Sequence, residues 1–383
     1  MRTTVPSGVP GFEQVYRAQR DRYPAAEPGW QPVHTVYVPA DRFTAGTVTA
    51  WGEEALALAE AHLGTPADLA EVFGAAGEAA AVHELVLRKL ATEPVEDLRV
   101  DFEDGYGVRP GEEDGHAEQA AGAVAAMHGA GTLPRRWGLR VKSFADGDPE
   151  RSVRTLDGFL TGVVERLGEL PDGFVVTFPK VLMEPYLGMF AAFLERLERA
   201  LRLPRLRFEI QVEAPQTLPF LRAELAAELG GRLAAAHFGV FDYTAALGLP
   251  PHEQRLDHPA CDHARHVMQT AFAGTGVELS DGSLAASSAS GSAADVRALW
   301  RRHAALVRHS LAHGFYQGWD MHPSHLVSRF ATVYAFHLAR YDTYRERVRA
   351  WEERRAARDG VMDEPATIKT LQAALRRAGL ALG

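Results

Sequence analysis

The chain has 383 residues, of which 46% are hydrophobic and 24% charged, a composition typical of a folded globular protein rather than of a disordered or collagen-like chain. Lys and Arg number 41 against 50 Asp and Glu, and a net charge of -9 lacks the basic excess that nucleic-acid binding uses. The single cysteine argues against an intramolecular disulfide, and the N-terminus lacks the pattern of a signal peptide for secretion. No run of roughly 18 apolar residues argues for a membrane span. We therefore expect a cytoplasmic protein with neither a nucleic-acid nor a membrane partner.

Short runs rich in β-branched and aromatic residues alternate with longer runs of helical period, a pattern typical of βα units around a parallel sheet. Eight strands are predicted, over residues 33–40, 98–104, 137–144, 174–181, 207–215, 234–243, 277–282 and 315–323. Eight such units favour a closed (β/α)8 TIM barrel, which uses about 250 residues as one domain, over an open sheet.

Helical stretches are predicted between and after these strands, over residues 45–63, 67–91, 149–168, from 184 onward, and 365–379. After Pro323 apolar residues recur three and four apart, and the pattern then becomes charged. We expect the apolar part to pack on the barrel or a neighbouring subunit, and the charged part to be a solvated helix face. The predicted organisation is an irregular N-terminal arm over 1–30, a catalytic barrel over 31–325 and a helical C-terminal extension over 326–383.

Charged side chains gather at the C-terminal ends of the predicted strands, where active sites of (β/α)8 barrels lie. They are Asp101, Glu103, Asp104, Arg140, Lys142, Lys180, Glu213, Asp242, Asp320 and His322. A barrel that only needed filling would be aliphatic at these positions, because buried charges are costly unless they are paired or metal-bound. Their convergence on one mouth indicates a catalytic site.

Six segments near these strand ends carry a family pattern: VDFEDGYG, LRVKS, FPKV, IQVEAPQTL, FGVFDYTAALG and MHPSHL. In this order they resemble the HpcH/HpaI aldolase, citrate lyase β-subunit and malate synthase superfamily, over about Val33 to Leu326. The resemblance implies a barrel of the phosphoenolpyruvate/pyruvate type with a divalent metal. It further implies carbon–carbon bond making or breaking beside a 2-oxo acid, in a homo-oligomer, either a trimer or a hexamer.

Glu213 and Asp242 match the superfamily's metal ligands. They end consecutive strands, so their carboxylates could meet about one inter-strand spacing apart, roughly 5 Å at the backbone. Hard oxygen donors favour Mg²⁺, with Mn²⁺ as the competitor, and such an ion could stabilise the enolate of a bound 2-oxo acid. The alternative is a buried ion network in which both carboxylates pair with Arg140 and Lys180.

Arg140 offers a planar fork that fits a substrate carboxylate, although an internal salt bridge to Glu103 or Asp101 is the compatible alternative. Lys142 stands where the superfamily has Asn; it could favour a substrate with a second carboxylate or a phosphate, or be a surface lysine. Lys180 could form a Schiff base in a metal-free aldolase, but the resemblance favours an electrostatic or structural contribution at the substrate site.

Two carboxylates compete for the general acid/base. Asp104 stands where related aldolases carry His, which suggests proton transfer by Asp104 with Asp101 and Glu103 as supports. Malate synthase relatives draw an Asp from near or beyond strand eight, and Asp320 could serve that purpose. His322 is interpreted as a structural histidine.

Two further segments have competing interpretations. LDHPACDHARH, residues 256–266, has histidine, cysteine and aspartate spacings that could suggest zinc, but it matches no compact zinc signature, and we expect a helix surface. The Ser/Gly/Ala-rich residues 280–295 could close over substrate, hold the phosphate of a coenzyme A ester, or form a flexible loop without a ligand.

We therefore expect a divalent-metal-dependent carbon–carbon lyase or aldolase that acts on a small 2-oxo or 2-hydroxy acid, or on its coenzyme A thioester, through a metal-stabilised enolate. A malate synthase-like condensation of an acyl-coenzyme A with glyoxylate would use the same metal and arginine in the synthetic direction. The contrasting hypothesis is a non-catalytic barrel that binds an oxo acid, because fold alone does not establish chemistry.

Overall fold

The computed structural model describes residues 9–24, 27–353 and 363–383. Within them, parallel strands form one eight-stranded sheet in the order β7-β6-β5-β4-β3-β2-β1-β8, so that successive strands are neighbours. The strands are β1 (His34–Pro39), β2 (Asp97–Asp101), β3 (Arg136–Arg140), β4 (Phe174–Phe178), β5 (Arg207–Val212), β6 (Leu233–Phe238), β7 (Glu278–Ser280) and β8 (Gly318–Asp320). The predicted (β/α)8 barrel is confirmed.

The barrel closes between its two shortest strands, β7 and β8, which have three residues each. A single parallel bridge joins Ser280 to Gln317 there, and the Asp281 N–H donates to the Gln317 carbonyl at 2.8 Å. On its other side β8 pairs with β1. We call the junction of residues 278–282 with residues 317–320 the barrel seam; it has fewer ladder contacts than the pairs of longer strands.

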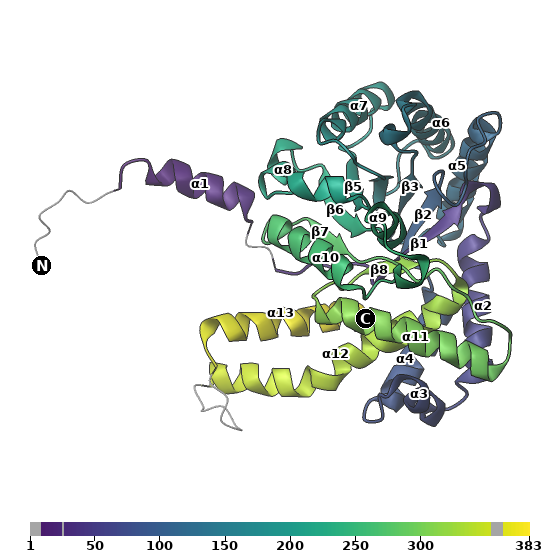
Figure 1. Cartoon of the computed structure of the whole chain (residues 1–383), viewed down its shortest axis with the longest axis vertical. Coiled ribbons are helices and arrows are strands. Elements are labelled where there is room, and N and C mark those ends of the chain that lie inside the picture. The colour runs from purple at the N-terminus through teal and green to yellow at the C-terminus, as the bar shows by residue number, and fades with distance from the viewer. Residues whose placement is uncertain (1–8, 25–26, 354–362) are drawn as a thin grey trace, which may run out of the picture.

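Helices surround the strands (Figure 1). They are α1 (Phe12–Arg22), α2 (Thr47–His62), α3 (Pro66–Phe73), α4 (Ala79–Thr92), α5 (Glu113–Ala130), α6 (Pro149–Leu167), α7 (Pro185–Leu201), α8 (Glu224–Glu228), α9 (Val240–Ala246), α10 (Pro259–Phe272), α11 (Ala293–Ala312), α12 (Pro323–Glu352) and α13 (Pro365–Leu382). The outer strand faces pack against them through large apolar side chains; Phe178 of β4, for example, stacks on Phe190 of α7 with ring centroids 4.4 Å apart. No helix of the described residues is long and apolar enough to cross a membrane.

The inner face of the barrel holds a buried polar layer. Arg99 of β2 donates from Nη2 to Glu209 of β5 at 2.8 Å and also pairs with Asp97. Thr177 of β4 accepts a hydrogen bond from Arg99 Nε at 3.0 Å. These side chains are fully buried, and the guanidinium lies between two carboxylates, which offsets much of the desolvation cost of all three charges.

The strand predicted over 234–243 ends earlier than expected. β6 stops at Phe238, and α9 begins at Val240. Thr244 Oγ1 donates to the Val240 carbonyl at 2.7 Å, which ties the first turn of this helix. Asp242 therefore lies in the first turn of a helix rather than on a strand, half-exposed at the barrel mouth.

Residues 67–91, predicted as one helical stretch, form two helices. α3 begins with a capping box between Thr65 and Asp68 and ends at Gly74, whose φ of 70° is left-handed. The backbone there turns away from the helix axis, and α4 begins afresh at Ala79.

The two ends of the chain also differ from expectation. The arm predicted as irregular contains the helix α1, which projects from the body and has no buried residue (Figure 1); residues 1–8 and 25–26 of this arm lie outside the described residues. The boundary predicted at 325/326 falls inside α12, whose first half is buried on the barrel and whose second half runs beside α13. Residues 354–362 of the predicted charged stretch lie outside the described part of the chain.

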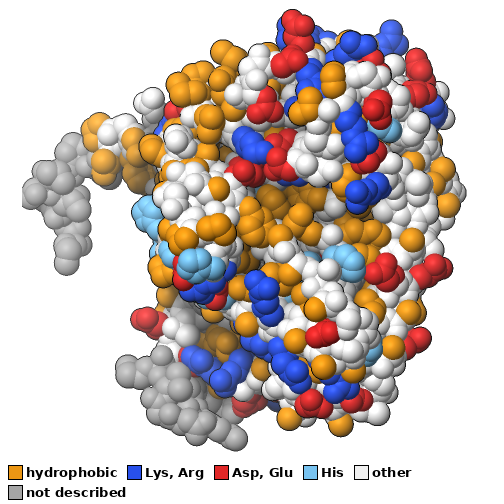
Figure 2. Space-filling view, turned by 45° about the vertical axis from the view of Figure 1, so that its right-hand side comes forward, with side chains coloured by type: hydrophobic (Ala, Val, Ile, Leu, Met, Phe, Trp, Pro, Cys, Tyr) orange, Lys and Arg blue, Asp and Glu red, His pale blue; other side chains and the backbone are white. Residues whose placement is uncertain are grey.

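The face of the molecule in Figure 2 carries acidic and basic side chains interspersed around a hollow with hydrophobic side chains. Among the described residues of this face there is no continuous basic stripe of the kind that follows a phosphate backbone.

Candidate active site

The turn after β2 is organised by Asp101, the last residue of that strand. Its Oδ1 accepts from the Glu103 N–H at 2.9 Å and its Oδ2 from the Gly105 N–H at 3.0 Å. A Cβ at Gly105 would lie 2.7 Å from Asp101 Oδ2, so this close approach requires glycine. The turn projects Glu103 and Asp104 into the mouth of the barrel.

Arg140 ends β3 directly opposite Asp101. Its Nε and Nη2 each donate to one Asp101 oxygen at 2.7 Å, and its Nη1 lies 3.2 Å from Glu103 Oε2. The guanidinium also lies over the Tyr37 ring at 4.9 Å. The internal salt bridge weighed from the sequence is thus present, and it uses the Nε/Nη2 edge. The Nη1 side is the part directed at the other mouth carboxylates.

Lys180, two residues after β4, connects the mouth carboxylates. Its Nζ lies 2.5 Å from both Glu103 Oε1 and Asp104 Oδ1 and 3.6 Å from Asp242 Oδ2. Its backbone is left-handed, with φ 47°, and its N–H donates to Glu213 Oε1 at 2.9 Å. One residue therefore contacts four carboxylates, three through its ammonium and one through its main chain.

Glu213 follows β5 and is buried, and Asp242 lies on α9 after β6. A Cβ at Gly239 would lie 2.5 Å from Glu213 Cβ, so glycine at the end of β6 makes room for this side chain. The structure thus brings Glu103, Asp104, Lys180, Glu213 and Asp242 together, as the strand-end argument predicts. We call these five residues the mouth cluster. The alternative ion network is present in part, because Lys180 lies within ion-pair distance of Asp242.

Negative charge is crowded in the mouth cluster. Burial, with the neighbouring charges of Glu103 and Asp242, raises the pKa of Glu213 to about 8. Burial and the charge of Asp104 raise the pKa of Glu103 to about 7, despite the nearby cations. Burial opposes ionisation of Asp104 as well, but hydrogen bonds such as that from Lys180 lower the pKa of this more exposed carboxyl. Carboxylate oxygens in excess over cations are the donor set that Mg²⁺ or Mn²⁺ takes in proteins, so these residues fit a divalent ion.

The same carboxylates keep Lys180 charged. Burial disfavours its ammonium, but Glu103 and Asp104 raise the pKa of Lys180 above its ordinary value. A lysine nucleophile must be neutral to attack a carbonyl, so this environment is the reverse of the one a Schiff-base lysine needs.

Lys142 lies beneath the mouth rather than in it. Its Nζ donates to the backbone carbonyls of Phe102 at 2.8 Å and Gly107 at 2.7 Å, and the side chain is buried. Burial lowers the pKa of its ammonium. The contacts make Lys142 a support of the turn after β2.

Asp320 lies apart from the mouth cluster, in a buried network on the outer side of β8. Arg329 of α12 donates to Asp320 Oδ1 at 2.9 Å, His34 Nδ1 lies 3.0 Å from Oδ2, and His303 of α11 approaches Oδ1 at 3.4 Å. Its neighbour Trp319 instead contacts Tyr37 inside the barrel. Burial opposes ionisation, yet Arg329 and the histidines hold the pKa of Asp320 well below its ordinary value. His322 accepts from the Ser324 N–H at 3.2 Å and caps α12, as the structural interpretation expects.

Two neutral side chains beside Arg140 were missed by reasoning that followed charges. Tyr37 of β1 lies under the guanidinium, and Gln211 Oε1 of β5 lies 3.4 Å from its Nη1. Both occupy inward positions of their strands, so the two-residue period of Tyr37 with Thr35, and of Gln211 with Glu209, is the signal that could have found them.

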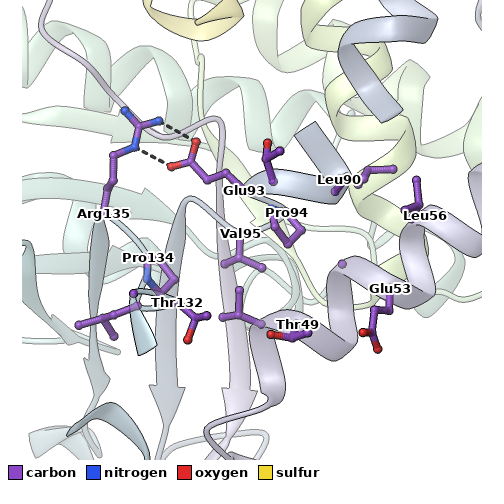
Figure 3. A pocket seen from close by; sticks show the side chains of 16 residues that line it. Thr49, Glu53, Leu56, Leu90, Glu93, Pro94, Val95, Thr132, Pro134 and Arg135 are labelled. Carbon is purple, nitrogen blue, oxygen red and sulfur yellow. Dashed lines mark hydrogen bonds and ion pairs between the residues drawn. The ribbon is translucent and has the colours of Figure 1, made fainter. Parts of the chain in front are cut away.

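A cavity of about 570 Å³ lies at the opposite end of the barrel, beside the N-terminal ends of β2 and β3. Its lining includes Thr49, Leu56, Leu90, Val95 and Pro134 (Figure 3). Of its three charged lining residues, Glu93 and Arg135 pair with each other at 2.6 Å and only Glu53 is left. This cavity offers apolar contact but no convergent catalytic groups.

Comparison with known proteins identifies the family. The family model described as "Domain of unknown function (DUF6986)" matches residues 12–382. The chain belongs to this family. No curated protein matches the chain.

Solved structures share the fold. A citrate lyase from Burkholderia xenovorans LB400 matches with a TM-score of 0.62 and 18% identity, over 93% of this chain and 95% of that chain. CitE from Mycobacterium tuberculosis, in complex with magnesium, acetoacetate and coenzyme A, matches with a TM-score of 0.51 and 19% identity, over 92% of this chain and 99% of that chain. Malate synthase from Haloferax volcanii, as a lead(II) complex, matches with a TM-score of 0.54 and 14% identity, over 93% of this chain and 90% of that chain. The chain therefore shares the barrel fold of these citrate lyase, CitE and malate synthase structures.

Proposed function

We propose that the chain is a divalent-metal-dependent carbon–carbon lyase that acts on a small 2-oxo or 2-hydroxy acid, or on its coenzyme A thioester. The observation that carries this proposal is the mouth cluster, in which Lys180 contacts four carboxylates, three through its ammonium and one through its main-chain N–H, at the C-terminal end of the strands of a (β/α)8 barrel. The likeness in fold to citrate lyase and to a CitE complex with magnesium, acetoacetate and coenzyme A supports it.

In this proposal Glu213 and Asp242 hold Mg²⁺ or Mn²⁺. When bound, the ion would draw negative charge from the keto and carboxylate oxygens of the substrate, which favours an enolate over the keto form. Gly239 leaves Glu213 the space to take this position, and the Lys180 N–H fixes one of its oxygens.

Arg140 holds the substrate carboxylate through its Nη1 side, because Asp101 occupies the other edge of the guanidinium. Asp101 thereby fixes the plane in which Arg140 presents its remaining donors. Lys180 holds Glu103 and Asp104 in place as an ammonium rather than as a nucleophile.

Asp104 is the proton-transfer group that we propose. It is half-exposed at the mouth, whereas Glu103 is buried and Asp320 belongs to the outer network. In the cleavage direction the electrons of the breaking carbon–carbon bond remain on the 2-oxo acid fragment as an enolate. Asp104, as a carboxylate, first takes the proton of the substrate hydroxyl, and the other fragment leaves as a carbonyl compound. Asp104 then delivers that proton to the enolate, directly or through water, which gives the keto acid.

The first test is exchange of pyruvate methyl protons in D₂O, followed by NMR, because exchange needs only enolate formation. Mg²⁺ or Mn²⁺ should support exchange, EDTA should abolish it, and both Glu213→Gln and Asp242→Asn should lose it. The exposed Glu224→Gln on α8 is the matched control and should exchange normally. Full activity in EDTA, together with inactivation by borohydride plus substrate, contradicts the proposal and favours Lys180 as a Schiff base.

The substrate class is tested with oxaloacetate, 4-hydroxy-2-oxo acids, and acyl-coenzyme A plus glyoxylate, each with added metal. Turnover of a free acid alone supports the aldolase form of the proposal. Turnover only with the acyl-coenzyme A pair supports malate synthase-like condensation at the same metal and arginine. Binding of oxo acids without turnover of any of them supports the non-catalytic barrel.

A further inference from the structure

Helices α10 and α11 bring together a second group of metal-ligating side chains, outside the mouth cluster. Asp262 lies in the first turn of α10, and His309 and His313 are one turn apart at the end of α11. His309 Nε2 lies 2.7 Å and His313 Nε2 3.6 Å from Asp262 Oδ1, and one ligand atom from each residue falls within 4.8 Å of the others. The side chains are 24%, 26% and 24% exposed, so an ion from solvent can reach them.

The hydrogen bonds around the group prepare it for a metal. His313 Nδ1 lies 2.9 Å from the His309 carbonyl, which can only accept, so Nδ1 carries the proton and Nε2 keeps its lone pair. Gln269 of α10 donates to the His313 carbonyl and fixes the end of α11 against α10. A backbone carbonyl on the far nitrogen of a histidine is the arrangement that orients metal-bound imidazoles.

Asp262 is held as a carboxylate in this position. Burial opposes its ionisation, but the hydrogen bond from His309 and the charge of Arg265 lower the pKa of Asp262. Arg265 donates to Asp262 Oδ1 at 2.6 Å and is itself buried and tied to Asp281 at 2.9 Å. His266, one turn after Asp262, places another imidazole with its ring centroid 5.7 Å from that of His313.

This group differs from the pattern that the sequence offered. Of the segment 256–266, Cys261 is turned into the core with its Sγ 3.6 Å from the Arg255 carbonyl, and burial raises the pKa of its thiol to about 12. The ligand set instead combines Asp262 of that segment with two histidines about fifty residues further on. Only the packing of α10 on α11 joins them.

We propose that Asp262, His309 and His313 bind a divalent transition-metal ion, best matched by Zn²⁺, as a clamp between α10 and α11. Two imidazoles and a carboxylate suit Zn²⁺ in ligand type, and His266 or a water completes four-coordination. The other histidine–aspartate group found among the described residues, His303 and His325 with Asp320, is unlike it, because all three of its residues are buried and an ion from solvent cannot reach them.

The clamp acts on the barrel seam. α10 leads into β7 and α11 leads into β8, the two short strands joined by the Ser280–Gln317 bridge. Arg265 links Asp262 to Asp281 at the end of β7, so an ion at Asp262 would stiffen the connection between the outer helices and this seam. The site is structural and independent of the chemistry at the mouth.

The test is Zn²⁺ titration of the full chain after EDTA treatment, by calorimetry, in both the wild type and the E213Q/D242N chain that lacks the proposed mouth ligands. One Zn²⁺ should bind in the E213Q/D242N background. H309A and H313A should each weaken this binding at least about tenfold, whereas H263A, an exposed histidine on α10, should not change it. Excess Mg²⁺ should not compete.

A second measurement guards against misfolded variants. In the E213Q/D242N background, Zn²⁺ should raise the thermal unfolding midpoint of the parent chain and of its H263A variant but not of its H313A variant, with circular dichroism showing the same helix content in all three. Absence of Zn²⁺ binding in the E213Q/D242N chain, or binding that H309A and H313A leave unchanged, overturns the proposal.

Discussion

The interior of the barrel and its mouth contain the same types of charged residue in different arrangements. In the interior, Arg99 lies between Asp97 and Glu209, so one guanidinium serves two carboxylates at hydrogen-bond distance. At the mouth, the ammonium of Lys180 contacts three carboxylates, the buried Glu213 receives only the main-chain N–H of Lys180, and much of the Arg140 guanidinium is already used by Asp101. Charges that only stabilise a fold are paired with one another. Buried carboxylates without a cation, by contrast, indicate a site for a metal ion or another bound group.

The largest predicted effect is on turnover. Asp104→Asn should lower kcat by about 10² to 10⁴ with little change in metal affinity, because Asn keeps the size and hydrogen bonding of Asp but cannot take up a proton. Asp320→Asn should keep kcat per folded molecule, because this carboxylate serves Arg329 rather than substrate. Steady-state kinetics of the two variants, corrected for the folded fraction, provide the measurement.

The reverse result is equally informative. A loss confined to Asp320→Asn would make Asp320 the base, in line with the malate synthase resemblance. Near-full activity in both variants would leave proton transfer to a bound water or to the substrate itself.

The next effect is on stability and compares the two layers directly. Arg99→Met should destabilise the fold by about 3 to 5 kcal/mol, because it leaves Asp97 and Glu209 buried without their cation. Glu213→Gln, measured in EDTA at neutral pH, should leave stability unchanged or raise it, because Glu213 must take up a proton to be buried in this crowded group and Gln needs none. Urea unfolding of both variants tests the contrast, and equal losses would show that the mouth is a structural ion network like the interior.

The smallest effect concerns substrate binding. Arg140→Lys keeps a cation beside Asp101 but loses the planar fork, so one charged hydrogen bond to the substrate carboxylate is lost. Such a bond contributes about 1.5 to 3 kcal/mol, and kcat/KM per folded molecule should fall roughly ten- to a hundredfold at unchanged metal affinity. The melting temperature should fall as well, because Lys keeps only part of the paired contact with Asp101. Kinetics identical to wild type would show that Arg140 does not bind substrate and only forms the ion pair with Asp101.

Much of this arrangement could be predicted from sequence because periodicity and strand ends are local signals. Glu103 and Lys180 lie in the turns that follow β2 and β4, and the barrel topology brings such turns together without further information. The pairing of Asp101 with Arg140 follows in the same way from neighbouring parallel strands in register.

The rest depended on details that a sequence pattern does not contain. β8 has only three residues, too few for a two-residue period to show which side faces inward, and Trp319 rather than Asp320 takes the inner position. The sequence pattern predicts Lys142 as one more charge at the mouth, but its ammonium donates to two backbone carbonyls of the turn after β2. Assembly into a trimer or hexamer stays a prediction, for which light scattering is the measurement.

The left-handed backbone of Lys180 has a mechanical consequence. A residue with a side chain is uncommon at φ 47°, and this one directs its main-chain N–H to Glu213 while its ammonium reaches Glu103 and Asp104. Lys180 therefore couples the loop after β4 to the turns that follow β2 and β5. A rotation of that single peptide would release a Glu213 oxygen and shift the base of the lysine side chain in the same movement, so a change in the backbone of this loop acts on both contacts at once.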